Sequence, residues 1–285
     1  MLTRDNIDEY QRRHGLSYHV PYALEAEAAV GLRGKSVIEI GGSLPEAFVR
    51  EGLGARCWIA IEEMAYWHEV QASGGTQGSP PAASLARRIA AAGPADFAAG
   101  YGVFSGRAEE LPPPLHGCFD AAFSIAAFEH IDRLALTFDG IHAALRPGGR
   151  LFAMFSPIWS AHNGHHLPEI RDRSGRQFNF SNSPIPPWGH LLMRPPELFE
   201  HLQARTDRDT AAEIVYYVYH SSHINRLFSE DYIAYCRSSA FEVERCETTF
   251  AEPPPAELQA ELERRYPGRT RFKNNGMLLV LKKPG

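Results

Sequence analysis

The stretch KSVIEIGGSLPEAF, residues 35–48, is the part of this sequence that most restricts the fold. Its apolar run ends in an acid and a glycine pair, the pattern of a strand that leads into a nucleotide-binding turn. Ser43 and Pro45 stand where a dinucleotide fingerprint has further glycines, so the turn suits a pyrophosphate poorly. The glycine pair still lets a small ligand without a phosphate approach the backbone closely. The stretch therefore predicts a nucleoside site and disfavours a nicotinamide-dependent oxidoreductase.

Short apolar runs recur through the first half of the chain and alternate with segments compatible with helices. Most of these runs are apolar on both faces, as expected of parallel strands covered by helices. The alternation predicts a doubly wound α/β sheet. The expected strands are 36–40, 57–62, 101–106, 119–125 and 149–155, and the expected helices are 45–52, 83–92 and 134–145. The alternation returns near the end of the chain at 229–240, 241–250, 256–266 and 276–283, the last of these being a closing strand.

Charge, cysteine content and hydropathy exclude several classes of protein. The formal net charge of -5 argues against a general nucleic-acid binder, which needs a basic surface. Cys57, Cys118, Cys236 and Cys246 form no C-x-x-C pair or disulfide-scaffold spacing, which fits a reducing compartment. The polar first residues lack the apolar region of a signal peptide, and no run approaches the roughly 20 apolar residues that span a bilayer. We expect a soluble, cytoplasmic protein without nucleic-acid or membrane partners, in an oligomeric state that the sequence leaves open.

Four further segments follow the first turn in order. AIEE ends the second strand with Glu62, 23 residues after Glu39, where a carboxylate can accept hydrogen bonds from both hydroxyls of a ribose. SGRAEELP, FDAAFSIAAFEHI and ALRPGGRLFAMF come next. In this order, over about residues 35–156, the motifs resemble those of class I S-adenosylmethionine-dependent methyltransferases, particularly the small-molecule group.

The resemblance implies a Rossmann-like sheet, mostly parallel with an antiparallel last strand, with helices on both faces, and S-adenosylmethionine as cofactor. An inserted cap is expected from the sequence itself, because the alternation of strand and helix breaks after Phe155. Arg107 stands where the family usually has an acid for the adenine amino group, so we expect that contact to pass to Glu109 or to the backbone. The implied cofactor residues are Glu39, Gly41, Gly42 and Ser43 along the methionine and ribose, Glu62 at the ribose hydroxyls, Ala108 and Glu109 beside the adenine, and Ser124 and Ala126 near the sulfonium.

The sequence pattern and the resemblance together lead us to expect four parts in the chain. Residues 1–34 form a helical segment that covers the cofactor site, and residues 35–156 form the cofactor-binding core. Residues 157–228 form a substrate cap rich in histidine and aromatic residues, and residues 229–285 complete the sheet. Within the core, the linker ASGGTQGSPP at 72–81 is expected to be a surface loop without a role in the chemistry.

Histidines are concentrated in the expected cap, and their function has three interpretations. His165 or His166 accepts a proton from a substrate hydroxyl, because an unperturbed imidazole has a pKa near 6.5. Alternatively, His162, His165 and His166 bind a divalent metal together with Glu169, or the histidines are structural. The metal is not favoured and no ligand set is assigned, because H-x-x-H around an Asn-Gly turn is not a metalloprotease helix. Seven of the 13 histidines lie here: His162, His165, His166, His190, His201, His220 and His223.

His130 is a further candidate base, because FEHI follows the fourth strand, close to where the methyl group would be presented. Packing at a helix start is the alternative. Trp159, His162, Trp188 and His190 are candidate substrate-binding residues, since aromatic side chains form walls for small acceptors.

These observations together predict methyl transfer from S-adenosylmethionine to a small-molecule acceptor. The histidine-rich cap favours O-methylation of a natural product or a sugar. The alternatives are an N- or C-methyltransferase and a protein that binds the cofactor without transferring its methyl group.

Overall fold

The strands of the first half form close to their predicted bounds in the computed structural model, which describes residues 1–42, 44–63 and 87–285. Strands β1 (Ser36–Ile40), β2 (Cys57–Glu62) and β5 (Phe119–Ile125) have the predicted bounds. Strand β4 (Tyr101–Ser105) is shorter by one residue, and β6 (Leu145–Phe155) begins four residues earlier than predicted. Apolar runs bounded by turn residues therefore locate these strands well.

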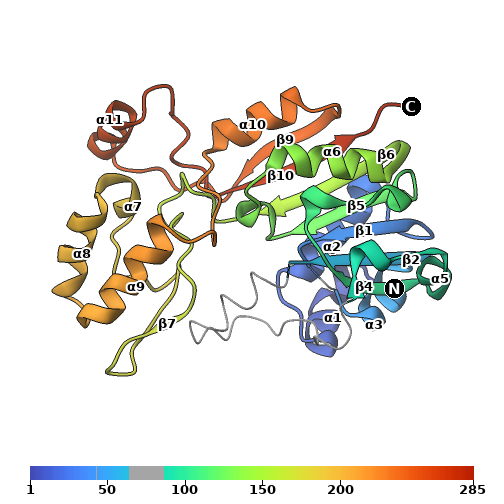
Figure 1. The fold of residues 1–285 in the computed structure, drawn as a ribbon, viewed down its shortest axis with the longest axis horizontal. Helices are drawn as coiled ribbons and strands as arrows, with labels where there is room; N and C mark the ends of the chain where they lie inside the picture. Colours follow the sequence, from blue (N-terminus) through green and yellow to red (C-terminus); the bar gives the residue numbers. More distant parts are fainter. Residues whose placement is uncertain (43, 64–86) are drawn as a thin grey trace.

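Within the described residues, eight strands form one sheet in the order β3-β4-β2-β1-β5-β6-β10-β9 (Figure 1). Strand β10 (Gly276–Lys282) lies between β6 and β9 (Glu242–Thr249) and runs antiparallel to both. The other neighbouring strands are parallel to each other. The predicted fold class is confirmed, namely a mostly parallel sheet whose last strand is antiparallel.

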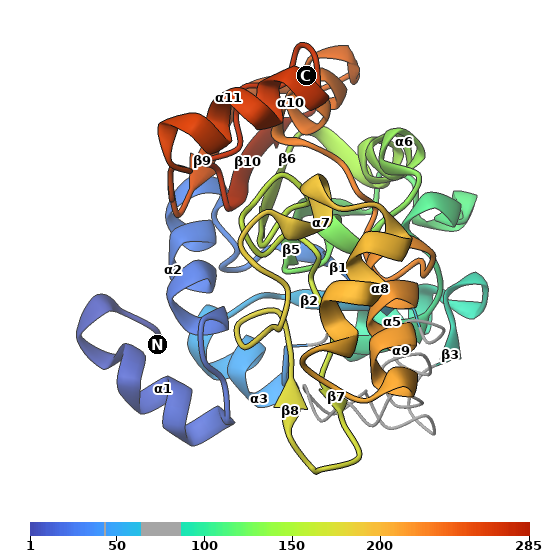
Figure 2. The same cartoon turned by 90° about the vertical axis from the view of Figure 1, so that its left-hand side faces the viewer.

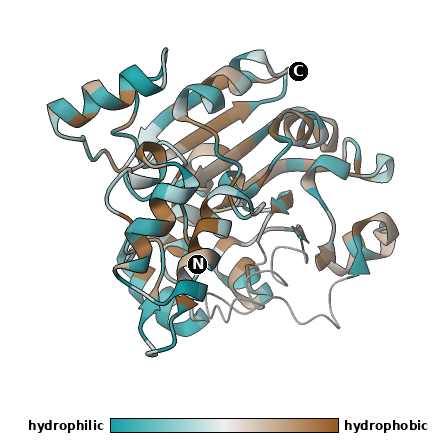
Figure 3. Ribbon diagram, turned by 60° about the vertical axis from the view of Figure 1, so that its left-hand side comes forward, coloured by the Kyte–Doolittle hydropathy of each residue, from teal (hydrophilic) through white to brown (hydrophobic). Residues whose placement is uncertain are grey.

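Helices cover both faces of this sheet. Alternate residues of a strand point to opposite faces, so Val37 and Ile38 of β1 belong to two different hydrophobic clusters. Figure 3 shows the apolar residues concentrated in the strands between these helices. Among the described residues, no helix is long and apolar enough to cross a membrane. The face that carries Val37 is covered by α1 (Ile7–His14), α2 (His19–Val30) and α3 (Glu46–Phe48). The face that carries Ile38 is covered by α6 (Leu134–Ala144) and α10 (Ser229–Ser238).

The predicted helix over residues 83–92 is wrong where the structure can be compared with it. Strand β3 (Arg87–Arg88) pairs in parallel with β4, and a 3-10 turn follows at Ile89–Ala91. The edge of β4 offers unpaired backbone groups, and pairing with them outweighs the helix propensity of this segment. The next helix, α5, starts only at Pro94 and spans Pro94–Ala99. Residues 83–86 and the predicted loop 72–81 lie outside the described residues.

Most of the chain between β6 and α10 forms a lobe beside the sheet, on the left in Figure 1. Figure 2 looks at this lobe directly and shows α8 and α9 packed side by side. The lobe contains α7 (Gly189–Leu192), α8 (Pro195–Gln203), α9 (Arg208–Tyr219) and a short hairpin of β7 (Ile170–Arg171) and β8 (Gln177–Phe178).

A third hydrophobic cluster holds the lobe together. It joins Trp188, Leu198 and Val218 with two residues from much later in the chain, Leu262 of α11 (Ala256–Arg265) and Phe272. All five side chains are buried. The lobe is therefore built from two separate stretches of chain.

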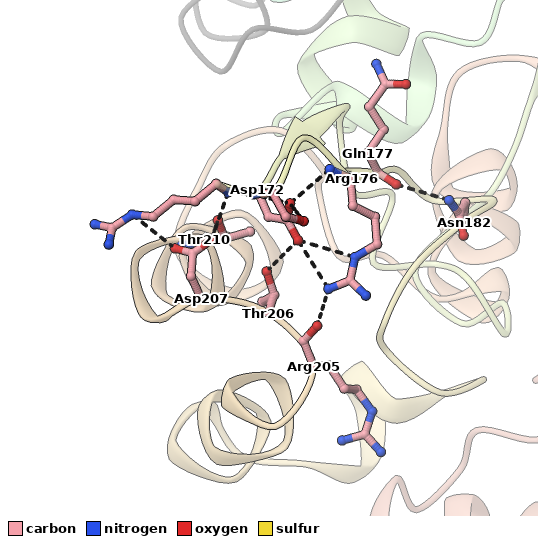
Figure 4. A network of polar contacts seen from close by, with 10 residues as sticks. Asp172, Arg176, Gln177, Asn182, Arg205, Thr206, Asp207 and Thr210 are labelled. Carbon is pink, nitrogen blue, oxygen red and sulfur yellow. Dashed lines mark hydrogen bonds and ion pairs between the residues drawn. The ribbon is translucent and has the colours of Figure 1, made fainter.

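A polar network fastens the hairpin of the lobe to the start of α9 (Figure 4). Asp172 Oδ1 accepts a hydrogen bond from the Arg176 backbone N at 2.9 Å, which closes the hairpin turn. Asp207 is the N-cap of α9 and accepts hydrogen bonds from Thr210 N at 3.2 Å and from Arg173 N at 3.1 Å. One carboxylate therefore begins the helix and also holds the hairpin in place.

Candidate active site

The carboxyl ends of four parallel strands meet along one edge of the sheet. The register places Ile40 of β1 beside Ile61 of β2, and Glu62 of β2 beside Ser105 of β4. Strands β1 and β5 are neighbours in the sheet. The chain continues from β1 to β2 on one side of this pair and from β5 to β6 on the other side. Ligands of doubly wound sheets bind at such a switch point. The candidate site therefore lies at the ends of β1, β2, β4 and β5.

The turn after β1 needs both of its glycines. Gly41 has φ +68°, and its N–H donates a hydrogen bond to the Ile61 carbonyl at 2.9 Å. A Cβ at Gly41 would lie 2.3 Å from Ala127 Cβ, and one at Gly42 would lie 2.7 Å from Glu39 Oε1. This bare backbone beside the switch point fits the close approach that the predicted cofactor requires. Ser43, also predicted to contact the cofactor, lies outside the described residues.

Glu39, at the end of β1, braces this turn. Its side chain is buried, and Oε2 accepts hydrogen bonds from Trp58 Nε1 at 2.5 Å and from Leu44 N at 3.1 Å. Burial raises the pKa of Glu39 to about 8, the two hydrogen bonds oppose that shift, and the nearby Glu62 adds to it. A direct contact between Glu39 and the cofactor remains a prediction.

Trp58→Phe is expected to lower the free energy of unfolding by about 2 kcal/mol, because it leaves the buried Glu39 carboxyl short of a donor. Chemical denaturation measures the change. In the Glu39→Leu background the same Trp58 substitution is expected to cost less, since no carboxyl group then loses its partner. An equal cost in both backgrounds would contradict the bracing role.

The expected ribose and adenine residues follow β2 and β4. Glu62 is buried at the end of β2, close enough to Glu39 to act on its pKa. Ala108 and Glu109 lie in a 3-10 turn, Ala108–Glu110, and both side chains are largely buried. Arg107 Nη2 donates to Glu109 Oε1 at 2.9 Å, so the carboxylate predicted to take over the adenine contact already has a cationic partner.

Two residues of β5 and its following turn complete the cofactor side. Ser124 Oγ donates to the Ile40 carbonyl at 2.9 Å and so ties β5 to β1. Ala126 has φ +52°, a conformation that residues other than glycine rarely adopt, and its N–H donates to the Met154 carbonyl at 2.8 Å. Strain of this kind is concentrated at functional sites.

A cluster of one carboxylate and three imidazoles lies directly after this strained residue. Glu129 and His130 belong to the 3-10 turn Phe128–His130, and His166 and His223 come from the loops before and after the helices of the lobe. The ring centroid of His130 lies 4.6 Å from that of His166 and 5.1 Å from that of His223. We call Glu129, His130, His166 and His223 the histidine cluster. The fold thus brings together His130 and His223, which are 93 residues apart in the sequence.

Burial controls the ionisation of the histidine cluster. Desolvation lowers the pKa of His130 to about 4 and that of His223 to about 3, and lowers the pKa of His166 well below its ordinary value. The three imidazoles are therefore neutral near pH 7. Burial also raises the pKa of Glu129 to about 8, and the nearby backbone amides of Glu129 and Ser156 oppose that shift only in part.

Asn225 positions the cluster, and the sequence interpretation missed it. Its side-chain Nδ2 donates to the carbonyls of Phe128 at 2.7 Å and Ile131 at 3.0 Å, and its backbone N donates to the Glu129 carbonyl at 2.9 Å. Tyr232 Oη in turn donates to Asn225 Oδ1 at 2.9 Å. No local motif marks Asn225, because its partners lie more than ninety residues earlier in the chain.

The other predicted histidine base lies outside the cluster. His165 is buried in the lobe, where its Nδ1 accepts a hydrogen bond from Leu167 N at 3.1 Å and its ring contacts that of His190. His166, the next residue, has φ +44°. This left-handed conformation separates the environments of the two neighbouring rings.

Most of the predicted substrate residues pack inside the lobe. His190 Nε2 donates to the Trp159 carbonyl at 2.8 Å, and Trp188 Nε1 donates to the Ser160 and Phe272 carbonyls, both at 3.2 Å. His162 is more exposed, and its Nδ1 lies 3.3 Å from Glu252 Oε2. These contacts give Trp159, Trp188 and His190 roles in packing, and their contact with an acceptor remains a prediction.

A surface hollow of about 410 Å³ also occurs in the lobe, around the network of Figure 4. It is lined in part by Asp172, Arg176, Arg205 and Asp207. Asp172 and Asp207 are engaged in the hydrogen bonds that hold the hairpin and α9. We therefore place the candidate active site at the strand ends and not in this hollow.

Comparison with known proteins adds a family to this geometry. Residues 68–153 match the sequence model of the family described as methyltransferase domain, and no curated protein matches the chain significantly. An S-adenosylmethionine-dependent methyltransferase from Mesorhizobium loti is 16% identical, with a TM-score of 0.46 over 94% of this chain and 98% of that one. The 1,6-didemethyltoxoflavin-N1-methyltransferase of Burkholderia thailandensis is 15% identical, with a TM-score of 0.41 over 99% of this chain and 85% of that one.

The sheet order, the glycine turn at the switch point and the matching family together define a class I S-adenosylmethionine-dependent methyltransferase. This protein is thus an enzyme, and its cofactor is S-adenosylmethionine. The predicted class and cofactor are confirmed. The roles of the individual site residues remain predictions.

Proposed function

We propose that the enzyme methylates an oxygen atom of a small molecule, a hydroxyl of a natural product or of a sugar unit. S-adenosylmethionine supplies, when bound, a methyl group on a sulfonium that is already a good leaving group. The chain must then align the acceptor oxygen, exclude water and remove the hydroxyl proton. One observation carries the proposal: a cluster of neutral imidazoles follows β5, beginning with His130, three residues beyond Ala127, the residue that lies against Gly41.

The histidine cluster removes the proton of the acceptor hydroxyl in this proposal. The oxygen gains the methyl group, the sulfonium becomes a thioether, and the proton leaves through the cluster. His130 and His166 are the candidates within it, because their rings lie against each other at the end of β5. His165 instead supports the lobe through its hydrogen bond with Leu167.

The same proposal gives each part of the chain a task. Residues 35–156 bind the cofactor, residues 157–228 cap the acceptor, and residues 229–285 complete the sheet. Residues 1–34 cover the site, which is supported by the position of Tyr18: this residue is 46% exposed, yet partial desolvation and then the charge of the nearby Glu129 raise its pKa. The net charge of -5 supports a small acceptor over a nucleic acid.

Incubation with S-adenosylmethionine and a panel of hydroxylated and amino acceptors is expected to yield O-methylated products. His166→Asn is expected to lower kcat about a hundredfold, because general-base catalysis contributes at least that much. Asparagine tolerates the positive φ of this position better than most residues. The dissociation constant of the His166→Asn variant for S-adenosylmethionine is expected to stay within about twofold of wild type, since the proposed cofactor contacts lie elsewhere.

His165→Asn serves as the matched control, because it changes the neighbouring histidine outside the cluster. It is expected to retain most of the turnover in folded protein. Unchanged turnover in His166→Asn, or products methylated only at nitrogen, would refute the proposed chemistry.

A further inference from the structure

The histidine cluster also has the geometry of a metal site. Glu129, His130 and His166 each offer a ligand atom, and these atoms all lie within 4.8 Å of one another. Among the residues that the structure describes, this is the one group of at least three such side chains. In a tetrahedral site with bonds of about 2.0–2.2 Å, ligand atoms lie about 3.4 Å apart, so small side-chain shifts close the cluster around an ion.

Among the described residues, no lysine or arginine pairs with the carboxylate of Glu129. Its side chain is fully buried, and neither oxygen has a hydrogen bond of normal geometry with any described residue. An ionised carboxylate in such surroundings is costly unless a cation or several donors compensate it. Within the described part of the chain, no lysine or arginine acts on its ionisation. A bound cation would supply the missing compensation.

One of the two imidazoles, that of His130, is held as metal-binding histidines usually are. His130 Nδ1 donates a hydrogen bond to the His223 carbonyl, which in a neutral ring leaves the lone pair on Nε2. Histidine ligands are commonly oriented by a bond of this kind from their other ring nitrogen to a backbone carbonyl. Nδ1 of His166 is buried without a hydrogen-bond partner among the described residues.

We propose that Glu129, His130 and His166 together bind one divalent transition-metal ion, with a position left open for an oxygen ligand. Two imidazoles and one carboxylate form a set that suits zinc or ferrous iron. Three protein ligands with an open position are typical of catalytic sites.

The proposed ligands differ from the set that the sequence suggested. His162 lies beside Glu252, and His165 accepts its hydrogen bond from Leu167. Glu169 accepts a hydrogen bond from Gln177 Nε2 at 2.6 Å. Of the histidines in the H-x-x-H-H segment, therefore, His166 is the one that the structure brings to the cluster.

The consequence for catalysis rests on the proposed function, whereas the test of metal binding does not. An ion in this position lowers the pKa of a hydroxyl that coordinates it. The acceptor would then lose its proton to solvent while bound to the ion, and a free imidazole would not be needed as the base. The binding experiment needs neither S-adenosylmethionine nor an acceptor, so either proposal can fail without the other.

The test uses the full chain without an affinity tag, stripped with a chelator and then titrated with Zn²⁺ against a chromogenic competitor. Wild type is expected to bind one equivalent tightly. Glu129→Gln and His166→Asn are expected to lower the affinity at least about a hundredfold, because each removes a ligand. Glu129→Gln keeps the shape of the side chain, and His165→Asn is the matched control that is expected to bind as wild type does.

A second measurement on the wild-type chain excludes cysteine ligands without any substitution. The absorption spectrum of the Co²⁺-loaded protein is expected to lack the intense charge-transfer bands of cysteine ligation. The proposal would be overturned if wild type did not bind the ion, or if Glu129→Gln and His166→Asn bound it as tightly as wild type does. A Co²⁺ spectrum with the bands of cysteine ligation would also overturn it.

Discussion

Glu62→Ala is expected to weaken S-adenosylmethionine binding about a thousandfold. The carboxylate stands at the end of β2, next to the switch point, where it can accept hydrogen bonds from both ribose hydroxyls. Each such bond to a charged group is worth about 1.5–3 kcal/mol, and 1.4 kcal/mol is a factor of ten in affinity. Calorimetric titration measures the loss. S-adenosylhomocysteine, which has the same ribose, is expected to lose affinity by the same factor.

Glu63→Ala is the matched control for this experiment. Glu63 follows Glu62 in the chain, but its carboxylate is about 40% exposed and lies 3.7 Å from Arg107 Nε. It is expected to bind the cofactor nearly as wild type does. Near-wild-type affinity in Glu62→Ala would show that the assignment of the ribose hydroxyls is wrong.

Gly41→Ala is expected to lower the free energy of unfolding by about 3 kcal/mol and to weaken cofactor binding as well. The left-handed backbone costs about 1–2 kcal/mol for any residue with a Cβ. The remainder comes from the clash with Ala127, whose Cβ would be 2.3 Å away. Relief of that clash moves the turn after β1 or the turn that Ala127 begins, and both border the predicted cofactor site.

Gly34→Ala separates the two contributions. Gly34 precedes β1 and also has φ +68°, but a Cβ there would meet no described atom within 4 Å. It is expected to cost only the conformational term of about 1–2 kcal/mol and to leave cofactor affinity unchanged. Chemical denaturation and calorimetric titration of both variants give the comparison. Equal effects at Gly34 and Gly41 would remove the argument for a close approach to Ala127.

The central strands could be predicted from the sequence because both of their faces are buried. The segment Ser36–Ile40 is apolar at every position except its first residue and Glu39, and such a run admits few interpretations. The edge strand Arg87–Arg88 could not be predicted, since its two residues are exposed and their conformation follows from pairing with β4. Propensity alone favoured a helix there.

The candidate site was predictable as far as its residues lie on those strands. Motif order indicated Gly41 and Glu62, and the structure places Gly41 at the switch point and Glu62 at the end of the neighbouring strand β2. Motif order could not indicate the hydrogen bond from Trp58 to Glu39, because these residues belong to different strands and only the strand register brings them together.

The two neighbouring histidines show where prediction from the sequence ends. Nothing in the dipeptide distinguishes His165 from His166, yet one packs in the lobe and the other joins Glu129 and His130. The difference depends on a single positive φ and on a loop whose path is set by distant contacts. Local propensity contains no information of that kind.

Construction of the lobe from two stretches of chain restricts how this lobe, the proposed acceptor cap, can be exchanged between related enzymes. In a chimera that replaces only residues 157–228, the foreign segment would have to pack against the native Leu262 and Phe272 side chains. Recombination that conserves packing must exchange both stretches together, although all of α10 and all of β9 lie between them in the chain. Substitutions in α11 are therefore expected to change the packing of the lobe that the proposed function assigns to the acceptor.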